Sequence, residues 1–161
     1  MNRRGFSLIE LIVVMSLIGI LVAIAALNFN SWQTKYNIEA QVKEMLADLT
    51  GARLMAIQTK REHRIILNPT SYAFWRYTGE SVASDTRVFN KQTKYPIQQF
   101  SDSGTLSNFS NTTITVDERG YTSDLLTIAV GIGLGNPAYD CLVVQRARVN
   151  MGKINGNKCV Y

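Results

Sequence analysis

A long apolar segment dominates the start of the chain, and polar residues become frequent only after it. Residues 11–27 contain no charged side chain, and Ser16 is their only polar one. A helix over residues 6–27, rising ~1.5 Å per residue, would be roughly 33 Å long, which is enough for the ~30 Å hydrocarbon core of a bilayer. We therefore predict that residues 6–29 form a transmembrane helix.

Helical periodicity continues beyond this segment. Apolar residues recur three and four positions apart at Ile38, Val42, Met45, Leu46, Leu49, Ala52, Ala56 and Ile57. The first proline is Pro69, so one continuous helix can run to about Lys60. Charged residues, Arg53 among them, are expected on the solvent-exposed half. The pattern predicts an amphipathic helix over about residues 31–61, whose apolar stripe must pack against the rest of the chain.

Short strand-like segments follow this helix. Residues 64–67 and 71–77 are predicted to form a hairpin around the turn at Asn68 and Pro69. Residues 78–111 are rich in polar side chains, and only residues 95–100 resemble a strand, so we expect this region to be irregular and exposed.

The C-terminal third also alternates apolar and polar residues. Strands are predicted at residues 112–117 and 125–132 around a turn near Gly120, and at residues 141–149 and 157–161. The fold class is therefore α+β: a long N-terminal helix, with a transmembrane half and an amphipathic half, packed on an antiparallel β-sheet at about residues 64–161.

Charge fixes the expected topology. The formal net charge is only +5, too small to indicate nucleic acid by composition alone. Arg3 and Arg4 immediately precede the apolar segment, which places the N-terminus in the cytoplasm and residues 30–161 outside it as a globular head. A secretory signal cleaved near Ala26 is the alternative. Glu10 lies inside the apolar segment, where an unpaired charge is costly.

The residues around Glu10, RRGFSLIE at positions 3–10, resemble the type III signal of type IV pilins and type II secretion pseudopilins. The resemblance implies that residues 1–5 are a leader removed after Gly5 by a prepilin peptidase, and that Phe6 becomes N-methylated. It also implies that Glu10 pairs with the terminal ammonium of a neighbouring subunit in a helical filament. The alternative is an exposed glutamate favoured by the helix dipole alone.

Three later segments, at residues 52–57, 117–120 and 142–153, are similar to the GspH/FimT family of minor pilins and pseudopilins. The resemblance implies the pilin fold and a structural subunit of a type IV pilus, held in the inner membrane before assembly. Its implied partners are other pilins or pseudopilins, the prepilin peptidase, the inner-membrane assembly platform and membrane lipid. An H-type pseudopilin of a type II secretion system is the first alternative.

DNA binding is the second alternative. Some FimT-like pilins capture DNA through a C-terminal Gly-Arg-x-Arg motif, and the corresponding residues 152–155 read Gly-Lys-Ile-Asn, so the second Arg is missing. The remaining candidates for phosphate contacts are Arg146, Arg148, Lys153 and Lys158. Arg146 and Arg148 would share one face of the predicted strand, although a solvated strand face explains them equally well.

The remaining candidate chemistry is limited. Cys141 and Cys159 fall in the extracytoplasmic part, where a disulfide closing the C-terminal hairpin is expected and two free thiols are the alternative. We interpret His63, the single histidine, as a surface residue at the helix end. Residues 131–135, GIGLG, fit a strand end and a loop, because no lysine follows as a phosphate loop requires. We predict no metal site, no cofactor and no enzymatic activity.

Overall fold

The computed structural model describes residues 7–76 and 86–161, without the side chains of residues 24–28. Its elements in chain order are α1 (Leu8–Thr59), β1 (His63–Asn68), β2 (Ser71–Arg76), β3 (Thr86–Gln92), β4 (Ile97–Phe100), β5 (Leu106–Asn108), β6 (Thr112–Val116), β7 (Leu126–Val130), β8 (Cys141–Val144), β9 (Val149–Asn155) and β10 (Lys158–Val160). One helix followed by antiparallel strands confirms the predicted α+β class.

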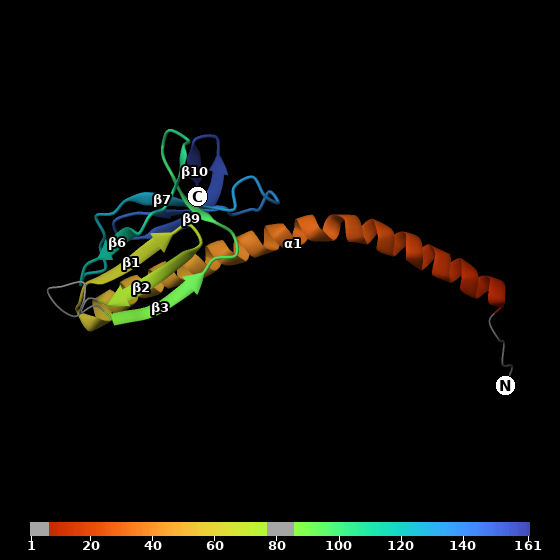
Figure 1. The fold of residues 1–161 in the computed structure, drawn as a ribbon, viewed down its shortest axis with the longest axis horizontal. Helices are drawn as coiled ribbons and strands as arrows, with labels where there is room; N and C mark the ends of the chain where they lie inside the picture. Colours follow the sequence, from red (N-terminus) through yellow and green to blue (C-terminus); the bar gives the residue numbers. More distant parts are fainter. Residues whose placement is uncertain (1–6, 77–85) are drawn as a thin grey trace.

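Helix α1 is a single curved rod, and Figure 1 shows its N-terminal half extending away from a head built on its C-terminal half. This confirms the predicted continuous helix. It ends at Lys60, which adopts the left-handed conformation (φ 51°) and donates its backbone N–H to the carbonyl of Ala56. Within the part of the chain that the structure describes, no helix has the length and hydropathy needed to cross a membrane.

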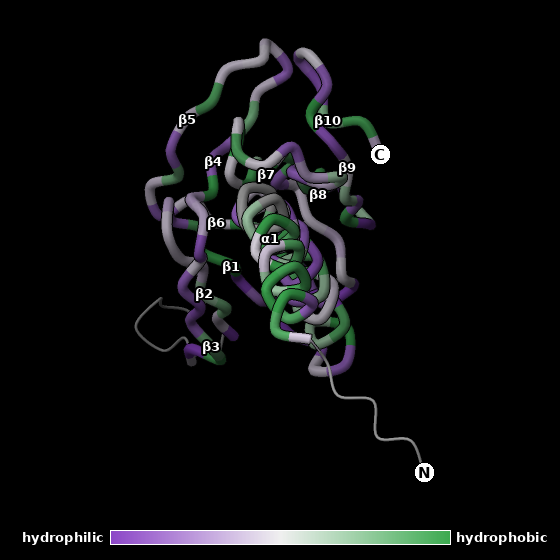
Figure 2. The backbone as a smooth tube through the Cα atoms, turned by 90° about the vertical axis from the view of Figure 1, so that its right-hand side faces the viewer, coloured by the Kyte–Doolittle hydropathy of each residue, from purple (hydrophilic) through white to green (hydrophobic). Residues whose placement is uncertain are grey.

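The strands form two antiparallel sheets, where the sequence predicted one. The first has the order β3-β2-β1-β6 and the second the order β10-β9-β8-β7-β4-β5. Figure 2 looks along α1 and shows β1 to β3 beside the helix and β7 to β9 above it. The carboxylate of Asp124 accepts a hydrogen bond from the N–H of Thr115 at the outer edge of β6. This bond gives an acceptor to a backbone N–H at the free edge of β6. The next strand, β7, belongs to the second sheet.

The core lies between the helix and the two sheets. The predicted helix stripe is buried at Ile38, Val42, Met45, Leu49, Ala52 and Ala56, and Leu46 packs partly against it. Two predictions at the edges of this stripe are wrong: Ile57 is exposed, whereas Arg53 is buried. The sheets contribute Ile65, Leu67, Phe74, Ile114, Val116, Ile128, Val130 and Leu142.

The predicted hairpin is present as β1 and β2, with Asn68 opposite Ser71. The predicted irregular region contains the expected strand as β4, but the prediction is wrong for β3, which pairs with β2 at the edge of the first sheet, and for β5, which pairs with β4. Only Phe89 and Lys91 of β3 are even half-buried, so its sequence lacks the alternation that identifies a strand. Residues 78–85 of that region, and residue 77 of the predicted strand before it, lie outside the described residues.

Three further strand boundaries differ from the prediction. The strand expected at residues 141–149 is two strands, because a turn at residues 145–148 separates β8 from β9. Strand β9 then occupies residues that were expected to connect the final pair. Strand β7 ends at Val130, because Gly131 has a φ of +57° and turns the chain before Ile132.

His63 is not a surface residue as predicted. It is the first residue of β1, only 1% exposed, and its ring stacks on Phe74 with the centroids 5.1 Å apart. Its Nδ1 lies 2.9 Å from the carbonyl oxygen of Arg61. His63 therefore belongs to the core, at the point where the chain enters the first sheet directly after the helix.

Candidate functional site

The predicted processing site is at the free end of α1. Gly5 and Phe6 lie outside the described residues, and Ser7 occupies the N-cap position in an extended conformation. Glu10 is in the first helical turn, exposed, and within the described residues its carboxylate has no hydrogen bond or ion pair. The geometry leaves this carboxylate accessible to a group from another molecule.

The helix around Glu10 exposes an apolar surface on all sides. The large residues from Leu8 to Val22 are about half to three-quarters exposed: Leu8, Ile9, Leu11, Ile12, Val13, Val14, Met15, Leu17, Ile18, Ile20, Leu21 and Val22. Contiguous apolar surface of this extent marks contact with lipid or with other protein chains. The head covers none of it, because its first fully buried helix residue is Ile38.

Arg53 links α1 to the far end of the head. Its Nη2 donates hydrogen bonds to the carbonyl oxygens of Gln145 and Arg146, in the turn between β8 and β9. The residue is 8% exposed, and burial lowers the pKa of its guanidinium. The sequence carried one signal for this, since Arg53 is four residues after buried Leu49 and so lies beside the apolar stripe.

The four basic candidates for DNA contact are not gathered in one place. Arg146 and Arg148 lie in the turn between β8 and β9, so the prediction that they share a strand face is wrong. Lys153 is on β9, five residues and roughly 17 Å of strand from Arg148. Lys158 is on the next strand, β10.

Three of these four basic side chains have local contacts within the described residues. The Arg146 guanidinium carbon is 6.0 Å from the centroid of the Tyr121 ring, and the Arg148 Nε donates to the side-chain oxygen of Gln145. The Lys153 ammonium donates to the Oδ1 of Asn136 at 2.6 Å. The arrangement offers two exposed arginines at one end of the sheet, the half-buried Lys153 further along β9, and the exposed Lys158 on β10.

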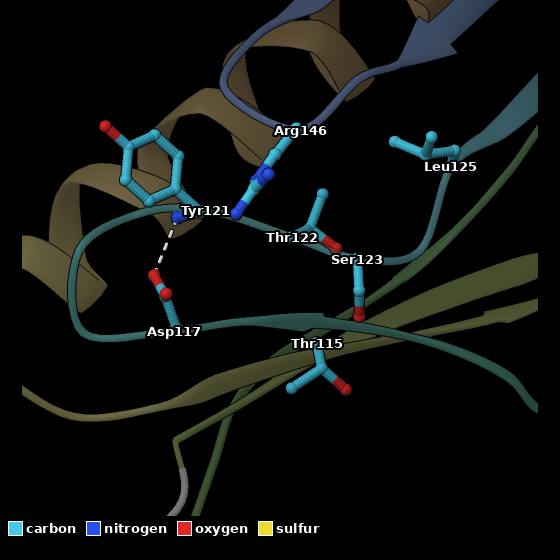
Figure 3. A pocket seen from close by; sticks show the side chains of 7 residues that line it. All are labelled: Thr115, Asp117, Tyr121, Thr122, Ser123, Leu125 and Arg146. Atoms are coloured by element: carbon cyan, nitrogen blue, oxygen red, sulfur yellow. Dashed lines mark hydrogen bonds between the residues drawn. The ribbon is translucent and has the colours of Figure 1, made fainter.

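A cleft of about 540 Å³ lies beside the arginine turn. Its lining, drawn in Figure 3, consists of Thr115, Asp117, Tyr121, Thr122, Ser123, Leu125 and Arg146. The Asp117 carboxylate accepts the backbone N–H of Tyr121 at 2.7 Å, which shapes the turn at residues 117–121. Ser123 has no histidine beside it, since His63 is buried in β1, so the lining offers no serine–histidine pair.

A disulfide joins Cys141 to Cys159, as predicted. Cys141 is on β8 and Cys159 on β10, so the bond passes over the intervening strand β9 and does not close a two-stranded hairpin. It crosses at Gly152, the register partner of Cys141. A Cβ atom at Gly152 would lie 2.2 Å from the carbonyl oxygen of Val160 and 3.1 Å from the Sγ of Cys159.

The glycine-rich residues 131–135 form a loop after β7, as predicted, and the loop packs on α1. A Cβ atom at Gly135 would lie 2.9 Å from the backbone nitrogen of Lys35, and one at Gly131 would lie 3.0 Å from Ile38. Both glycines also have positive φ values. Further along the loop, the N–H of Ala138 donates to the carboxylate of Glu39. These contacts place the loop where the helix leaves the head.

Comparison with known proteins gives two matches that agree with this geometry. Residues 1–26 match the family described as the prokaryotic N-terminal methylation motif. The fold is similar to that of the type IV minor pilin FimU of Pseudomonas aeruginosa, with a TM-score of 0.53 and 13% identity, over 78% of this chain and 94% of that one. No curated protein sequence matches the chain. The first match concerns the N-terminal segment alone, and the second shows a shared fold.

Proposed function

Because the chain combines this N-terminal motif with a pilin-like fold, we propose that it is a minor pilin, a structural and non-catalytic subunit of a type IV pilus. The observation that carries the proposal is the juxtaposition of a methylation motif at residues 1–26 with a helix that the head leaves bare as far as residue 22. A bare apolar helix of this length requires lipid or neighbouring helices around it.

The proposal assigns a role to each segment. Residues 1–5 are the leader, removed after Gly5, and Phe6 is then N-methylated. Residues 6–29 hold the precursor in the inner membrane and later enter the filament core. Residues 30–161 form the extracytoplasmic head. The charge-free residues 11–27 and the two preceding arginines support this orientation.

Glu10 has an assembly role in this proposal. A carboxylate surrounded by apolar helices is strongly destabilised unless an opposite charge is close to it. The terminal ammonium of Phe6 on a neighbouring subunit would supply that charge. The exposed position of Glu10 in the first turn of α1 is compatible with such a contact. Pairing would therefore favour the assembled filament over the isolated subunit.

Two other functions compete with this proposal. An H-type pseudopilin would use the same leader, the same helix and a similar head, and the C-terminal disulfide makes us prefer the pilus. DNA capture would need clustered phosphate contacts, because the net charge is small. The distance along the sheet between the arginine turn and Lys153 argues against such a cluster, and we do not favour it.

Deletion of the gene, scored in parallel for surface pili, twitching motility and protein secretion, tests the proposal. We expect pili and twitching to be reduced, with secretion unchanged, and the wild-type gene to restore both. A matched control is complementation with a Gly5 variant that blocks leader removal, which we expect not to restore them. Loss of secretion with normal pili would assign the protein to the type II system. No change in pili, twitching or secretion would contradict both assignments.

A further inference from the structure

Three aromatic side chains form an exposed ladder on α1 just before Ile38, the first fully buried helix residue. The ring centroids of Phe29 and Trp32 are 6.4 Å apart, and those of Trp32 and Tyr36 are 5.9 Å apart in a stacked arrangement. The three residues are 59%, 62% and 61% exposed. Tyr36 is two positions before buried Ile38 and so points away from the head. The fold of the isolated chain gives these rings no cover.

The ladder begins where the aliphatic segment ends. Residues 11–27 are almost entirely aliphatic, whereas the next two turns carry the three rings interleaved with Asn28, Asn30 and Gln33. A seam between two helices would be expected to continue with aliphatic residues. A mixture of aromatic rings and amides instead matches the region where hydrocarbon gives way to lipid headgroups, since Trp and Tyr are enriched there.

Helix length places the ladder at that boundary. From Phe6 to Trp32 a continuous helix rises ~39 Å, close to the ~40–45 Å thickness of a bilayer with its headgroup regions. With Arg3 and Arg4 at the cytoplasmic headgroups, the rings reach the opposite headgroup layer.

We propose that Phe29, Trp32 and Tyr36 form an interfacial anchor, which binds the outer headgroup layer of a phospholipid bilayer and fixes the depth of α1 before assembly. This rests on the proposed function, which places residues 6–29 in the inner membrane. The anchor also positions the head, because Ile38, the first fully buried helix residue, is only ~9 Å of helix beyond Trp32.

The head presents a compatible surface at the same level. The loop of residues 131–135 packs against Lys35, the residue before Tyr36 of the ladder, and exposes 44% of Leu134. Lys35 is itself exposed and can approach lipid phosphates. Glu39, the nearest acidic residue of α1, already accepts a hydrogen bond from the loop. The anchor therefore brings this loop, and not the distant arginine turn, next to the lipid.

Depth-dependent fluorescence quenching tests the anchor on the full-length protein. The chain has two tryptophans, so the Trp75→Phe variant leaves Trp32 as the only one. Trp75 is on β2, and its indole N–H is buried with no hydrogen-bond partner among the described residues, so phenylalanine removes no such bond there. The protein is reconstituted into phosphatidylethanolamine and phosphatidylglycerol vesicles, with lipids brominated either near the headgroup or near the chain end.

We expect shallow bromines to quench Trp32 at least ~2-fold more than deep ones, as for a residue at the interface. The matched Trp32→Phe variant, which reports Trp75 in the head, should be quenched by neither lipid. Lack of quenching of Trp32, or stronger quenching by deep bromines, would overturn the anchor. An emission that depends on the ratio of protein to lipid would overturn it in favour of contact with a second copy.

Vesicle flotation separates this proposal from the one on which it depends. If the protein floats with the vesicles but Trp32 is not quenched, the membrane role of residues 6–29 stands and the anchor is contradicted. Protein that does not float at all would contradict the membrane role of residues 6–29 as well.

Discussion

The Arg53 side chain ties helix α1 to the turn between β8 and β9. It is buried and donates to two carbonyl oxygens, those of Gln145 and Arg146. Hydrogen bonds from a charged donor contribute more than neutral ones, about 1.5–3 kcal/mol. Arg53 therefore helps to position the turn that carries both exposed arginines, together with the N–H of Thr122, which donates to the Arg146 carbonyl.

Replacing Arg53 should loosen this connection. We expect Arg53→Ala to lower the free energy of unfolding of the head by about 2–3 kcal/mol, because the carbonyl of Gln145 loses its charged donor and that of Arg146 keeps only the backbone N–H of Thr122. Urea denaturation of the full-length protein in detergent, followed by near-ultraviolet circular dichroism, measures the change. Arg119→Ala, at an exposed turn position, is the control and should change stability by no more than ~0.5 kcal/mol. Equal effects of the two substitutions would contradict the role given to Arg53.

The cluster of Asp48, Tyr72 and Lys91 makes the head sensitive to alkali. The Tyr72 hydroxyl donates to the Asp48 carboxylate, and burial together with this bond raises the pKa of Tyr72 well above its usual 10.0. Burial alone would lower the pKa of Lys91, but its bonds to Asp48 and Glu44 raise it overall. Both groups keep their protons longer in the folded state, so stability is full below pH ~10 and falls as the pH rises above it.

Tyr72→Phe should remove part of this alkaline destabilisation. At pH 7 we expect a loss of about 1 kcal/mol, from the lost hydrogen bond. Between about pH 10 and pH 11 the difference from the unsubstituted protein should shrink, because the variant has no phenol to ionise on unfolding. Denaturation midpoints across this pH range test the sign, with Tyr121→Phe at an exposed position as control. A difference that grows with pH would be the wrong sign.

At the residue scale, the sequence predicted the disulfide correctly but predicted the burial of two polar residues wrongly. Cys141 and Cys159 were paired correctly from the compartment alone. Arg53 and His63 were assigned to the surface because polar residues are usually exposed, yet both are buried with carbonyl partners from distant or neighbouring backbone. The carbonyl partners of Arg53 lie 92 and 93 residues further along the chain, so no local pattern identifies them.

Strand β10 depends on the absence of a side chain at Gly152. The disulfide and the carbonyl oxygen of Val160 pass over this position. The φ of Gly152 is not in the left-handed region, so its backbone conformation does not itself require glycine. Gly152 is also the glycine that corresponds to the first residue of the Gly-Arg-x-Arg motif. The structure gives a steric reason for a glycine at this position. Any side chain would separate β10 from β9.

Gly152→Ala should destabilise the head by about 3 kcal/mol, the upper end of typical overpacking costs. It should also raise the fraction of free thiol at Cys159, measured by maleimide labelling of protein purified without reductant. Gly51→Ala is the matched control: nothing lies within 4 Å of a Cβ there, and alanine in a helix should stabilise by about 0.5–1 kcal/mol. Normal disulfide formation and stability in Gly152→Ala would contradict the steric account.

At the scale of elements, strong periodicity was sufficient for α1 and for the hairpin of β1 and β2. It failed for β3, an edge strand that turns almost no apolar residue inward, and for β9, whose central Gly152 interrupts the pattern. The division into two sheets was also missed. Strand β6 pairs with β1, whereas β7 pairs with β4 and β8, and such long-range pairing has no local sequence signal.

On the scale of the whole molecule, Glu10 separates membrane insertion from assembly. If its carboxylate pairs with the ammonium of Phe6 on a neighbour, Glu10→Ala should leave leader removal and membrane insertion intact. Incorporation into sheared filaments, measured by immunoblot, should fall about 10-fold or more, since an unpaired buried charge costs several kcal/mol. Glu10→Gln should behave similarly if charge and not hydrogen bonding decides. Normal incorporation of both variants would favour the helix-dipole interpretation.

The central claim is that this chain is a prepilin whose mature N-terminus is Phe6, and the intact mass of the membrane-extracted protein tests it most directly. In a host with an active prepilin peptidase, the account predicts a chain that begins at Phe6 and carries one added methyl group, with the disulfide between Cys141 and Cys159 formed. A chain that still begins at Met1, or one cut near Ala26, would contradict it.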